Sequence, residues 1–396
     1  MINKPLLSIL IATKNRQKYC LNAIESILKN NYSNMEVVVQ DNSDDKSLEQ
    51  MLQKFLLDKR LVYRYTPPPF SSIDNFNAVL GLASGEYVCL IGDDDGITEN
   101  IFLLTEWAYK NNVDSICPTK LIHYVWPNDK TNGKMVIPYF SKKIWCNNPL
   151  ENIQPLIEDG IVQYMKFNLP KLYHGIVKLK LLEEVKTKTG YYIGGLSPDI
   201  YASISLSKIV NKHVVIDFPV TIAGASPKST TIDNTLGKHS GKLENAPHFR
   251  DRGDYIWESI VPRFYSVQTI WAETAIKAIK DMEIEVDLSK LNLQKMLAAA
   301  LIDSNAYEDL FIEEIQKIKP FEYDSFMRDV KKYQKKLKIN SLFSRIFNGV
   351  PRKYIYRTVR ITNIADIDTC THLSNNELTK RYNLKKILSD FNGKLK

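Results

Sequence analysis

Three adjacent aspartates, Asp93, Asp94 and Asp95, follow directly after the apolar stretch 87–91 and are flanked by glycines. Carboxylates this close repel one another, so a fold keeps them together mainly where a cation neutralises them. Carboxylate oxygens suit Mg²⁺ or Mn²⁺, and such an ion can bind substrate phosphates at the same time. Because Asp and Gly are also favoured in turns, the alternative is a polar surface turn without a ligand.

Polar residues also end two earlier apolar stretches. Residues 7–12 are followed by Thr13-Lys14-Asn15-Arg16, and residues 35–40 are followed by Asp41. Ligands bind outside the carboxyl ends of strands in open α/β sheets, so we expect these residues and the aspartates at one rim. Asp41 suits a hydrogen bond from a nucleobase imide or a ribose hydroxyl, with an Asx turn or a helix cap as the alternative.

The elements that must position these residues alternate between short apolar runs and helical periodicity. Strands are expected at 7–12, 35–40, 61–65, 87–91 and 114–118, and helices of amphipathic spacing lie between them. Near-continuous β-branched runs separated by helices indicate a parallel sheet covered on both faces. The fold class is therefore predicted as α/β.

The later part of the chain changes character. The Gly, Ser, Thr, Asn, Pro and His content between 222 and 254 indicates a long loop or linker, and the helical spacing after it indicates a mainly helical accessory domain. We expect a catalytic domain over 1–230, made of halves 1–110 and 111–230, then a linker over 231–255 and a basic helical domain over 256–396.

The composition excludes a disordered or fibrous protein, and the charge distribution limits the possible partners. The chain has 396 residues, of which 44% are hydrophobic and 25% charged, as in soluble globular proteins. Residues 331–396 hold 16 Lys and Arg against 4 Asp and Glu, whereas residues 1–330 hold 37 against 41. The basic end fits a helix on an anionic membrane face, or a core-facing helix with a solvated basic face. Nucleic acid is disfavoured because no recognised binding motif accompanies the charge.

The cysteines and the apolar runs bear on location. Five cysteines form no Cys-x-x-Cys pair, which indicates neither a disulfide framework nor a thiolate zinc site and fits a reducing cytosol. The run 6–12 precedes Lys14 and Arg16, the wrong order for a secretory signal, and no window has the length of a membrane span. We expect a cytoplasmic protein with at most a peripheral contact to the inner face of the plasma membrane.

The order of these motifs resembles the family 2 glycosyltransferases of the GT-A fold. The resemblance rests on residues 13–16, residues 40–43, Gly85-Glu86-Tyr87 before a strand, and the aspartate cluster. It covers residues 5–120 well and 170–225 loosely. It implies a mostly parallel sheet flanked by helices and a transferase that uses a nucleotide-diphosphate sugar.

The resemblance also implies roles for individual residues. By position, Asp41 is similar to the family residue that reads the base, commonly uracil. Substrate-binding roles are implied for polar residues on the rim: Thr13, Asn15, Arg16, Asp41, Asn75, Asn77 and Asp93. Asp94, with Asp95 beside it, is similar to the metal ligands of the family's Asp-x-Asp-type motif, although this chain has Gly92 where the usual pattern has an Asp.

Glycosyl transfer calls for one more acid. Breaking the anomeric C–O bond builds negative charge on the leaving phosphate oxygen, and the acceptor hydroxyl must lose a proton to a general base. Asp199, at the start of a helix expected over 198–210, is the candidate, because the resembling family has an acidic residue at such a place. Ser197, Pro198 and Asp199 are also typical of an ordinary helix start.

The loop after residue 222 supplies two further candidates. Family members can close such a loop over the nucleotide and bring a His or basic residue to the metal or diphosphate. This implies a substrate-binding role for Lys228 and a metal-binding role for His239, with a solvent-exposed, unliganded His as the alternative.

The resulting hypothesis is an inverting, Mn²⁺- or Mg²⁺-dependent glycosyltransferase. Its donor is a nucleotide sugar, with a UDP-sugar favoured, and its acceptor is a cell-surface polysaccharide or a lipid-linked glycan. One alternative is a sugar-phosphate nucleotidyltransferase, but residues 13–16 lack the glycine expected of its loop. The other alternative is a non-catalytic module that binds sugar nucleotides or polysaccharide.

Overall fold

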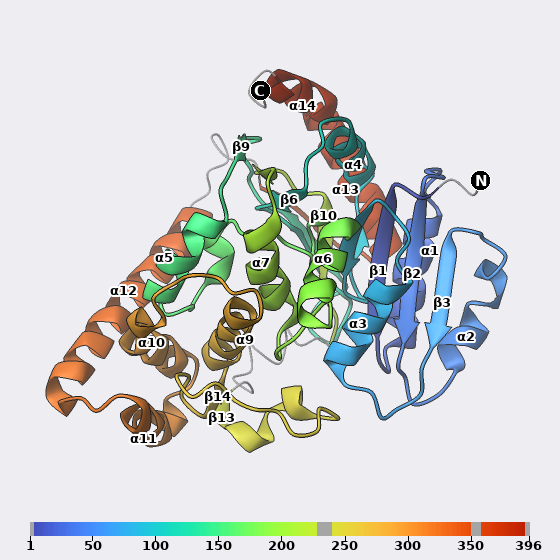
Figure 1. The fold of residues 1–396 in the computed structure, drawn as a ribbon. Coiled ribbons are helices and arrows are strands. Elements are labelled where there is room, and N and C mark those ends of the chain that lie inside the picture. Colours follow the sequence, from blue (N-terminus) through green and yellow to red (C-terminus); the bar gives the residue numbers. More distant parts are fainter. Residues whose placement is uncertain (1–3, 228–239, 350–357, 393–396) are drawn as a thin grey trace.

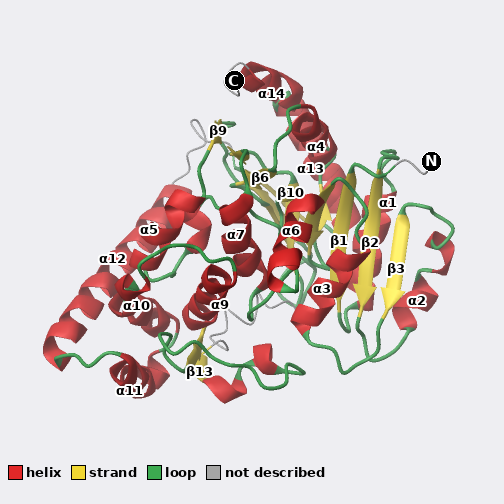
Figure 2. Ribbon diagram, viewed as in Figure 1, coloured by secondary structure: helices red, strands yellow, loops and turns green. Residues whose placement is uncertain are grey.

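The computed structural model describes residues 4–227, 240–349 and 358–392. A central sheet runs through the molecule with helices on both faces (Figures 1 and 2). Its strand order is β3 (Leu61–Tyr65), β2 (Met35–Asp41), β1 (Leu7–Thr13), β4 (Tyr87–Ile91), β10 (Ile176–Lys178), β6 (Ser115–Pro118), β11 (His213–Ile216) and β9 (Ile144–Cys146).

The strand directions confirm the α/β class with a mostly parallel sheet. β1, β2, β3 and β4 are mutually parallel, and β11 is parallel to β6. β10 lies antiparallel between β4 and β6, and β9 is antiparallel to β11 at the edge. The arrowheads of β1, β2 and β3 point to the same edge in Figure 2, so their carboxyl ends meet there.

Alternation along β1 builds a core on each face of the sheet. Leu7, Ile9 and Ile11 belong to one buried cluster, and Leu10 belongs to the other. The first cluster is covered by α1 (Gln17–Leu28), α2 (Ser47–Met51), α4 (Asn100–Lys110), α13 (Ile367–Arg381) and α14 (Leu384–Asn392). The second is covered by α3 (Ser72–Leu82), α5 (Ile153–Glu158), α6 (Leu179–Thr189), α7 (Pro198–Ile209) and α9 (Val267–Asp281). A sheet buried on both faces explains why its strands are continuously apolar.

A second sheet crosses beside the ends of β4 and β6. Its order is β15 (Val359–Thr362), β8 (Lys134–Ile137), β7 (Ile122–Val125), β12 (Thr221–Ala225) and β5 (Gly96–Ile97). β5 follows the aspartate cluster directly and pairs with β12. The cluster is thereby held between the two sheets.

Helices between residues 293 and 349 form a third core. α10 (Leu293–Asp303), α11 (Glu308–Ile318) and α12 (Tyr323–Gly349) bury residues such as Leu297, Phe311 and Val330. A helix was expected over 256–280, but α9 begins only at Val267, after β14 (Phe264–Ser266), which pairs with β13 (Ser240–Lys242). The cause is a capping box, in which the side chains and backbones of Ser266 and Thr269 satisfy each other.

The end of the described chain returns to the first third of the molecule. β15 pairs with β8, α13 packs against α1, and the indole of Trp107 on α4 donates a hydrogen bond to Asn392 on α14 at 2.7 Å. Figure 1 shows α13 and α14 beside α4, far from α10 and α11. The domain bounds expected at 230 and 256 stay a prediction. Within the expected last domain, α10 to α12 and residues 359–392 belong to different cores.

Among the described residues, no helix has the length and apolar character needed to cross a membrane.

Residues 359–392, here called the returning segment, pack against the first third of the chain. This packing predicts that two isoleucines contribute differently to stability. Ile367 on α13 is fully buried, whereas Ile256 is 90% exposed. We expect Ile367→Ala to lower the free energy of unfolding by about 2–5 kcal/mol and Ile256→Ala to change it by less than about 0.5 kcal/mol. Urea unfolding followed by tryptophan fluorescence measures both. Equal effects of the two variants would show that the returning segment does not contribute to the first of the two cores on the central sheet.

Candidate active site

The carboxyl ends of three strands meet at one cavity. Thr13 at the end of β1 lies level with Asp41 at the end of β2, and Ile11 pairs with Ile91 at the end of β4. Beyond them is a cavity of about 420 Å³. Its polar lining comes from loops that are far apart in the sequence: Thr13, Lys14, Arg16, Asn42, Ser72, Asn75, Asp93, Asp94, Asp95, Tyr173, His174, Arg250 and Asp251.

Arg16 joins two of the aspartates. Its guanidinium lies 3.0 Å from Asp93 Oδ1 and 2.7 Å from Asp94 Oδ2, and it donates a hydrogen bond to Ser226 Oγ. Thr13 Oγ1 donates to the other oxygen of Asp93 at 2.7 Å, and the backbone N–H of Ser226 donates to Asp94 at 3.0 Å. Asp93 and Asp94 therefore face the cavity and share one internal cation.

Asp95 is used differently, because its carboxylate holds the surrounding backbone. One oxygen accepts from the N–H of Gly92 at 2.6 Å and from the Tyr173 hydroxyl at 3.1 Å, and the other accepts from the N–H of Gly224 at 2.7 Å. Its side chain also lies 3.3 Å from the ring of His174. Burial lowers the pKa of His174 to about 3, so this ring is neutral and offers Asp95 no balancing charge.

Burial dominates the electrostatics of the cluster. It raises the pKa of Asp93 to about 7, against the opposing effect of Arg16, and with the charge of Asp94 it raises the pKa of Asp95 to about 7. Burial alone disfavours the charged guanidinium of Arg16, but the charges of Asp93 and Asp94 outweigh it and raise that pKa. Burial thus favours the neutral forms of Asp93 and Asp95, and Arg16 opposes this effect at Asp93.

Neighbouring residues fix the position of the Asp94 backbone. The indole of Trp126 donates to the carbonyl oxygen of Asp94 at 2.9 Å, and Tyr19 packs edge-on against that indole with ring centroids 4.9 Å apart. A Cβ on Gly224 would collide with the same carbonyl oxygen. Only glycine therefore lets β12 approach the cluster this closely.

Several buried polar atoms around the cavity have no hydrogen-bond partner within the described parts of the chain. They are Arg16 Nε, Asn42 Oδ1, Asn75 Oδ1 and His174 Nδ1. Buried polar groups are nearly always paired, so unpaired donors and acceptors on one cavity wall indicate a polar ligand.

Three of the residues predicted for substrate binding serve the framework beside the cavity. Asp41 accepts from Ser43 N and from the Tyr63 hydroxyl, each at 2.9 Å, and its neighbour Asn42 lines the cavity instead. Asn15 ties the loops after β1 and β2 together through Asp44. The side chain of Asn77 is occupied by backbone groups of residues 73, 192 and 193.

Asp199 lies in the first turn of α7, preceded by Pro198 at the first helical position. It does not line the cavity, but Tyr173 links the two: its phenol donates to Asp95 and is within electrostatic range of Asp199, Asp94 and Asp93. Burial raises the pKa of Asp199 to about 6, while Lys171 opposes the shift. The loop before it is held by Thr274 of α9, whose hydroxyl accepts from Leu196 N and Ser197 N.

Two predicted residues, Lys228 and His239, lie outside the described residues. The roles predicted for all the site residues, including Asn15, Asp41 and Asn77, stay predictions. Sequence reasoning did not identify Tyr173, Arg250 or Asp251 as part of the site. Lys14 lies 3.8 Å from Asp251, which shows that the segment after β13 contributes to the cavity, and no motif signals that contact.

The side chains of the cavity supply some, but not all, of the ligands that a divalent cation needs. In the described portion of the chain, no three His, Cys, Asp or Glu side chains form a ready metal site. Mg²⁺ and Mn²⁺ sites that bind phosphorylated substrates typically use one or two carboxylates together with the substrate phosphates. Asp93 Oδ1 and Asp94 Oδ2, already bridged by the cationic Arg16, are such a pair.

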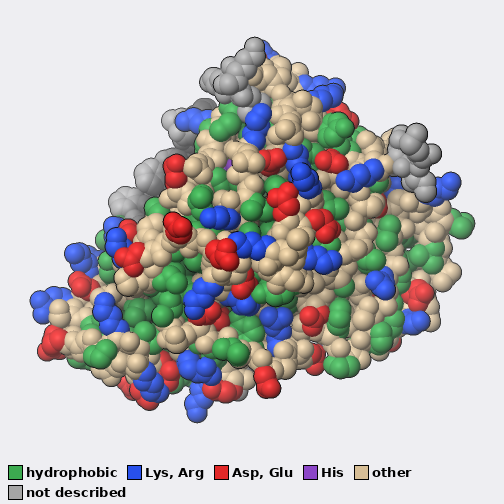
Figure 3. Space-filling view, viewed as in Figure 1, with side chains coloured by type: hydrophobic (Ala, Val, Ile, Leu, Met, Phe, Trp, Pro, Cys, Tyr) green, Lys and Arg blue, Asp and Glu red, His purple; other side chains and the backbone are tan. Residues whose placement is uncertain are grey.

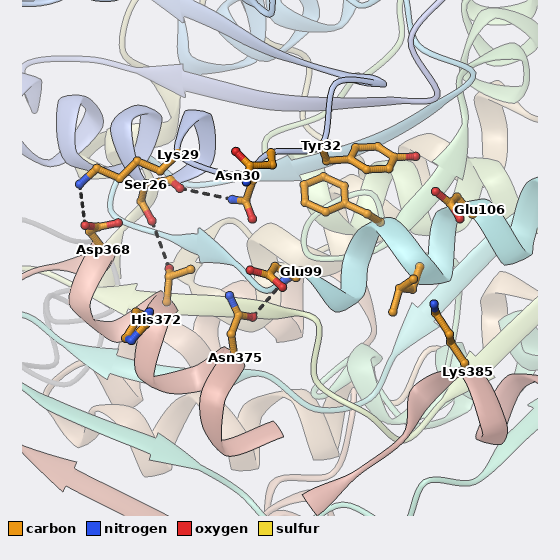
Figure 4. Close-up of a pocket in the computed structure, with 14 residues that line it drawn as sticks. Ser26, Lys29, Asn30, Tyr32, Glu99, Glu106, Asp368, His372, Asn375 and Lys385 are labelled. Carbon is orange, nitrogen blue, oxygen red and sulfur yellow. Dashed lines mark hydrogen bonds and ion pairs between the residues drawn. The ribbon is translucent and has the colours of Figure 1, made fainter. Parts of the chain in front are cut away.

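A larger hollow of about 720 Å³ lies elsewhere, between α1, α4, α13 and α14 (Figure 4). Lys29 contacts Asp368 at 2.7 Å across it, and Asn375 accepts from the N–H of Glu99 at 3.0 Å. None of the strand-end residues lines this hollow. It marks the seam between the returning segment and the first third of the chain.

The comparisons with known proteins agree with this geometry. Residues 8–157 match the family described as Glycosyl transferase family 2. A region of 102 residues is 38% identical to the "Putative colanic acid biosynthesis glycosyl transferase WcaA" of Escherichia coli, covering 25% of this chain and 36% of that protein. A region of 172 residues is 32% identical to an "Uncharacterized glycosyltransferase" of Haemophilus influenzae, covering 43% and 50%.

A third relative is the "GalNAc(5)-diNAcBac-PP-undecaprenol beta-1,3-glucosyltransferase" of Campylobacter jejuni, 38% identical over 98 residues, with 23% of this chain and 30% of that protein covered. The chain thus spans at most half the length of these curated relatives. Among solved structures, S. aureus TarS 1–349 in complex with UDP-GlcNAc aligns at 14% identity and a TM-score of 0.47, covering 83% of this chain and 89% of that one.

These matches agree with the resemblance seen in the sequence: residues 8–157 are similar to the family 2 glycosyltransferases.

Proposed function

We propose that the protein is an inverting, metal-dependent glycosyltransferase. It transfers a hexosyl or N-acetylhexosaminyl group from a nucleotide-diphosphate donor, with a UDP-sugar favoured, to a hydroxyl of a cell-surface polysaccharide or lipid-linked glycan. The observation that carries the proposal is the carboxylate pair Asp93 and Asp94, bridged by Arg16 in a cavity at the carboxyl ends of β1, β2 and β4.

The chain's own residues account for donor binding. Asp93 and Asp94 would hold the divalent ion together with the donor phosphates, and that ion, when bound, stabilises charge on the leaving diphosphate as a Lewis acid. The cationic side chains of Lys14, Arg16 and Arg250 line the same cavity and suit an anionic diphosphate. The amide oxygens of Asn42 and Asn75, which have no hydrogen-bond partner among the described residues, are suitable acceptors for nucleoside or sugar hydroxyls.

Asp199 is the proposed general base. It would accept the acceptor hydroxyl's proton while that oxygen attacks the anomeric carbon on the face opposite the leaving phosphate, which inverts the configuration. Burial near Tyr173 raises its pKa to about 6, so it is ionised at neutral pH yet basic enough to take a proton.

The acceptor class is supported by two relatives. One is named for colanic acid biosynthesis and another for action on an undecaprenol-linked glycan. The alternative remains a non-catalytic module that binds sugar nucleotides, and turnover separates the two.

Release of nucleoside diphosphate from a panel of sugar nucleotides tests the function. With Mn²⁺ and an acceptor mixture we expect turnover with at least one donor and none in EDTA, because the leaving diphosphate then lacks its cation. Asp94→Asn should abolish metal-dependent turnover, whereas Asp129→Asn, which removes an exposed carboxylate, should leave it unchanged. Donor binding by every variant without turnover under any condition would instead favour the binding module.

Asp199 generates a second prediction. Asp199→Asn should retain donor affinity but lower kcat about 10²–10⁴-fold, the usual contribution of a positioned base. Because only the carboxylate accepts a proton, wild-type kcat/KM should fall as the pH drops below about 6. Asp199→Glu is the matched control, since it keeps a carboxylate and should retain more activity than Asp199→Asn. A near-normal kcat for Asp199→Asn would remove this residue from the mechanism.

We also propose that α12 contacts the anionic inner face of the plasma membrane, where a lipid-linked acceptor would be presented. Val330 is buried in the third core, and Tyr333 and Leu337 pack against it. The lysines beside these residues are exposed: Lys331, Lys332, Lys335, Lys336 and Lys338. Figure 3 shows basic and acidic side chains interleaved over the viewed face. A run of lysines on one helix is therefore a local concentration of positive charge rather than a general property of the surface.

Vesicle sedimentation at low salt tests this contact. Replacing Lys331, Lys332, Lys335 and Lys336 by Gln should weaken binding to phosphatidylglycerol vesicles at least about tenfold, since each lysine near such a surface contributes about 1 kcal/mol. The control replaces four exposed lysines on other elements: Lys59, Lys110, Lys130 and Lys180. If both quadruple variants bind alike, α12 has only a solvated basic face.

A further inference from the structure

Arg16 occupies the position between the two carboxylates that face the donor cavity. It follows β1 at the start of α1, and its side chain is only 18% exposed. One guanidinium nitrogen contacts Asp93 Oδ1 at 3.0 Å and another contacts Asp94 Oδ2 at 2.7 Å. Its guanidinium carbon lies 5.6 Å from the centroid of the Tyr19 ring.

The same two oxygens are the ones proposed for the divalent cation. A guanidinium and a divalent ion repel each other, so the two cations compete for these carboxylate oxygens. Binding of the metal would therefore weaken the contact of Arg16 with at least one of its two carboxylates. Metal alone supplies no new anionic partner for the displaced guanidinium.

A nucleoside diphosphate supplies that partner. Arginine binds phosphate through two parallel N–H bonds, and Arg16 Nε is a buried donor without a hydrogen-bond partner among the described residues. Arg16 also contacts Ser226 at the end of β12, so its movement would release a contact between the first and second sheets.

We infer that Arg16 is the resident counter-ion of the Asp93–Asp94 pair and exchanges place with the divalent cation when the metal and the nucleoside diphosphate enter together. The inference rests on the proposed function. It makes Arg16 a positioning residue that couples metal binding to nucleotide binding. By linkage, the metal then strengthens nucleotide binding by the same factor as the nucleotide strengthens metal binding.

Mn²⁺ binding without nucleotide tests the exchange, with free Mn²⁺ measured by electron paramagnetic resonance. Removing the competing cation in Arg16→Met should tighten Mn²⁺ binding about tenfold or more, because a charged hydrogen bond to a buried carboxylate no longer has to be broken. Adding UDP should tighten Mn²⁺ binding strongly in the wild type and much less in Arg16→Met.

Two further variants are compared with Arg16→Met in the same experiment. Lys18→Met removes the same charge from an exposed position on α1 that does not line the cavity, so it should leave Mn²⁺ affinity unchanged. Ser226→Ala removes one partner of Arg16 while both carboxylates stay paired, so it should tighten Mn²⁺ binding by a smaller factor and keeps the test valid if Arg16→Met does not fold. Circular dichroism checks the fold of each variant.

The outcomes separate the exchange from the proposed function. If folded Arg16→Met and Ser226→Ala bind Mn²⁺ no more tightly than the wild type, Arg16 does not compete with the metal and the inference is overturned, even if the wild type turns over sugar nucleotides. If both tighten Mn²⁺ binding while no sugar nucleotide is bound or turned over, the exchange stands and the transferase proposal fails. Equal tightening in Lys18→Met would reduce the effect to net charge and also overturn the inference.

Discussion

The structure around the cavity depends on one electrostatic constraint, the burial of three consecutive aspartates at the end of β4. Each carboxylate is less than a tenth exposed, and burial raises the pKa of both Asp93 and Asp95, which favours their neutral forms. Asp95 is balanced by backbone N–H groups from two segments, whereas Asp93 and Asp94 share the guanidinium of Arg16. Each of these carboxylates therefore depends on a particular neighbour at hydrogen-bonding distance.

Those neighbours explain much of the surrounding architecture. The N–H of Gly224 reaches Asp95 because β12 pairs with β5, the short strand that directly follows the cluster. Trp126, just after β7, fixes the backbone of Asp94. The second sheet is in turn extended by β15 from the end of the chain, so residues 359–392 support the same region from the far side. The site is therefore shaped by contacts between residues that are 32 positions apart, as for Trp126 and Asp94, and 129 positions apart, as for Gly224 and Asp95.

The hydrophobic pattern of short stretches of sequence was enough to predict that several polar strand ends meet at one edge of the sheet. Apolar runs ending in Thr13, Asp41 and the aspartate cluster are complete within short stretches of sequence, and parallel pairing then brings their ends together. The start of α9 was missed because the Ser266–Thr269 capping box outweighed apolar spacing that continued upstream. Asn77 has the polar character of a ligand-binding residue, yet its amide is occupied by backbone groups near residue 193, a pairing that spacing does not encode. The returning segment was likewise invisible, since its amphipathic helices suit any apolar surface.

A crystal structure with UDP and Mn²⁺ tests the central claim most directly. We expect an anomalous Mn²⁺ peak beside the carboxylates of Asp93 and Asp94, with the Arg16 guanidinium moved onto a phosphate and Asp95 still hydrogen-bonded to Gly92 and Gly224. A diphosphate bound away from this rim, or a guanidinium still bridging both carboxylates with the metal held elsewhere, would contradict it.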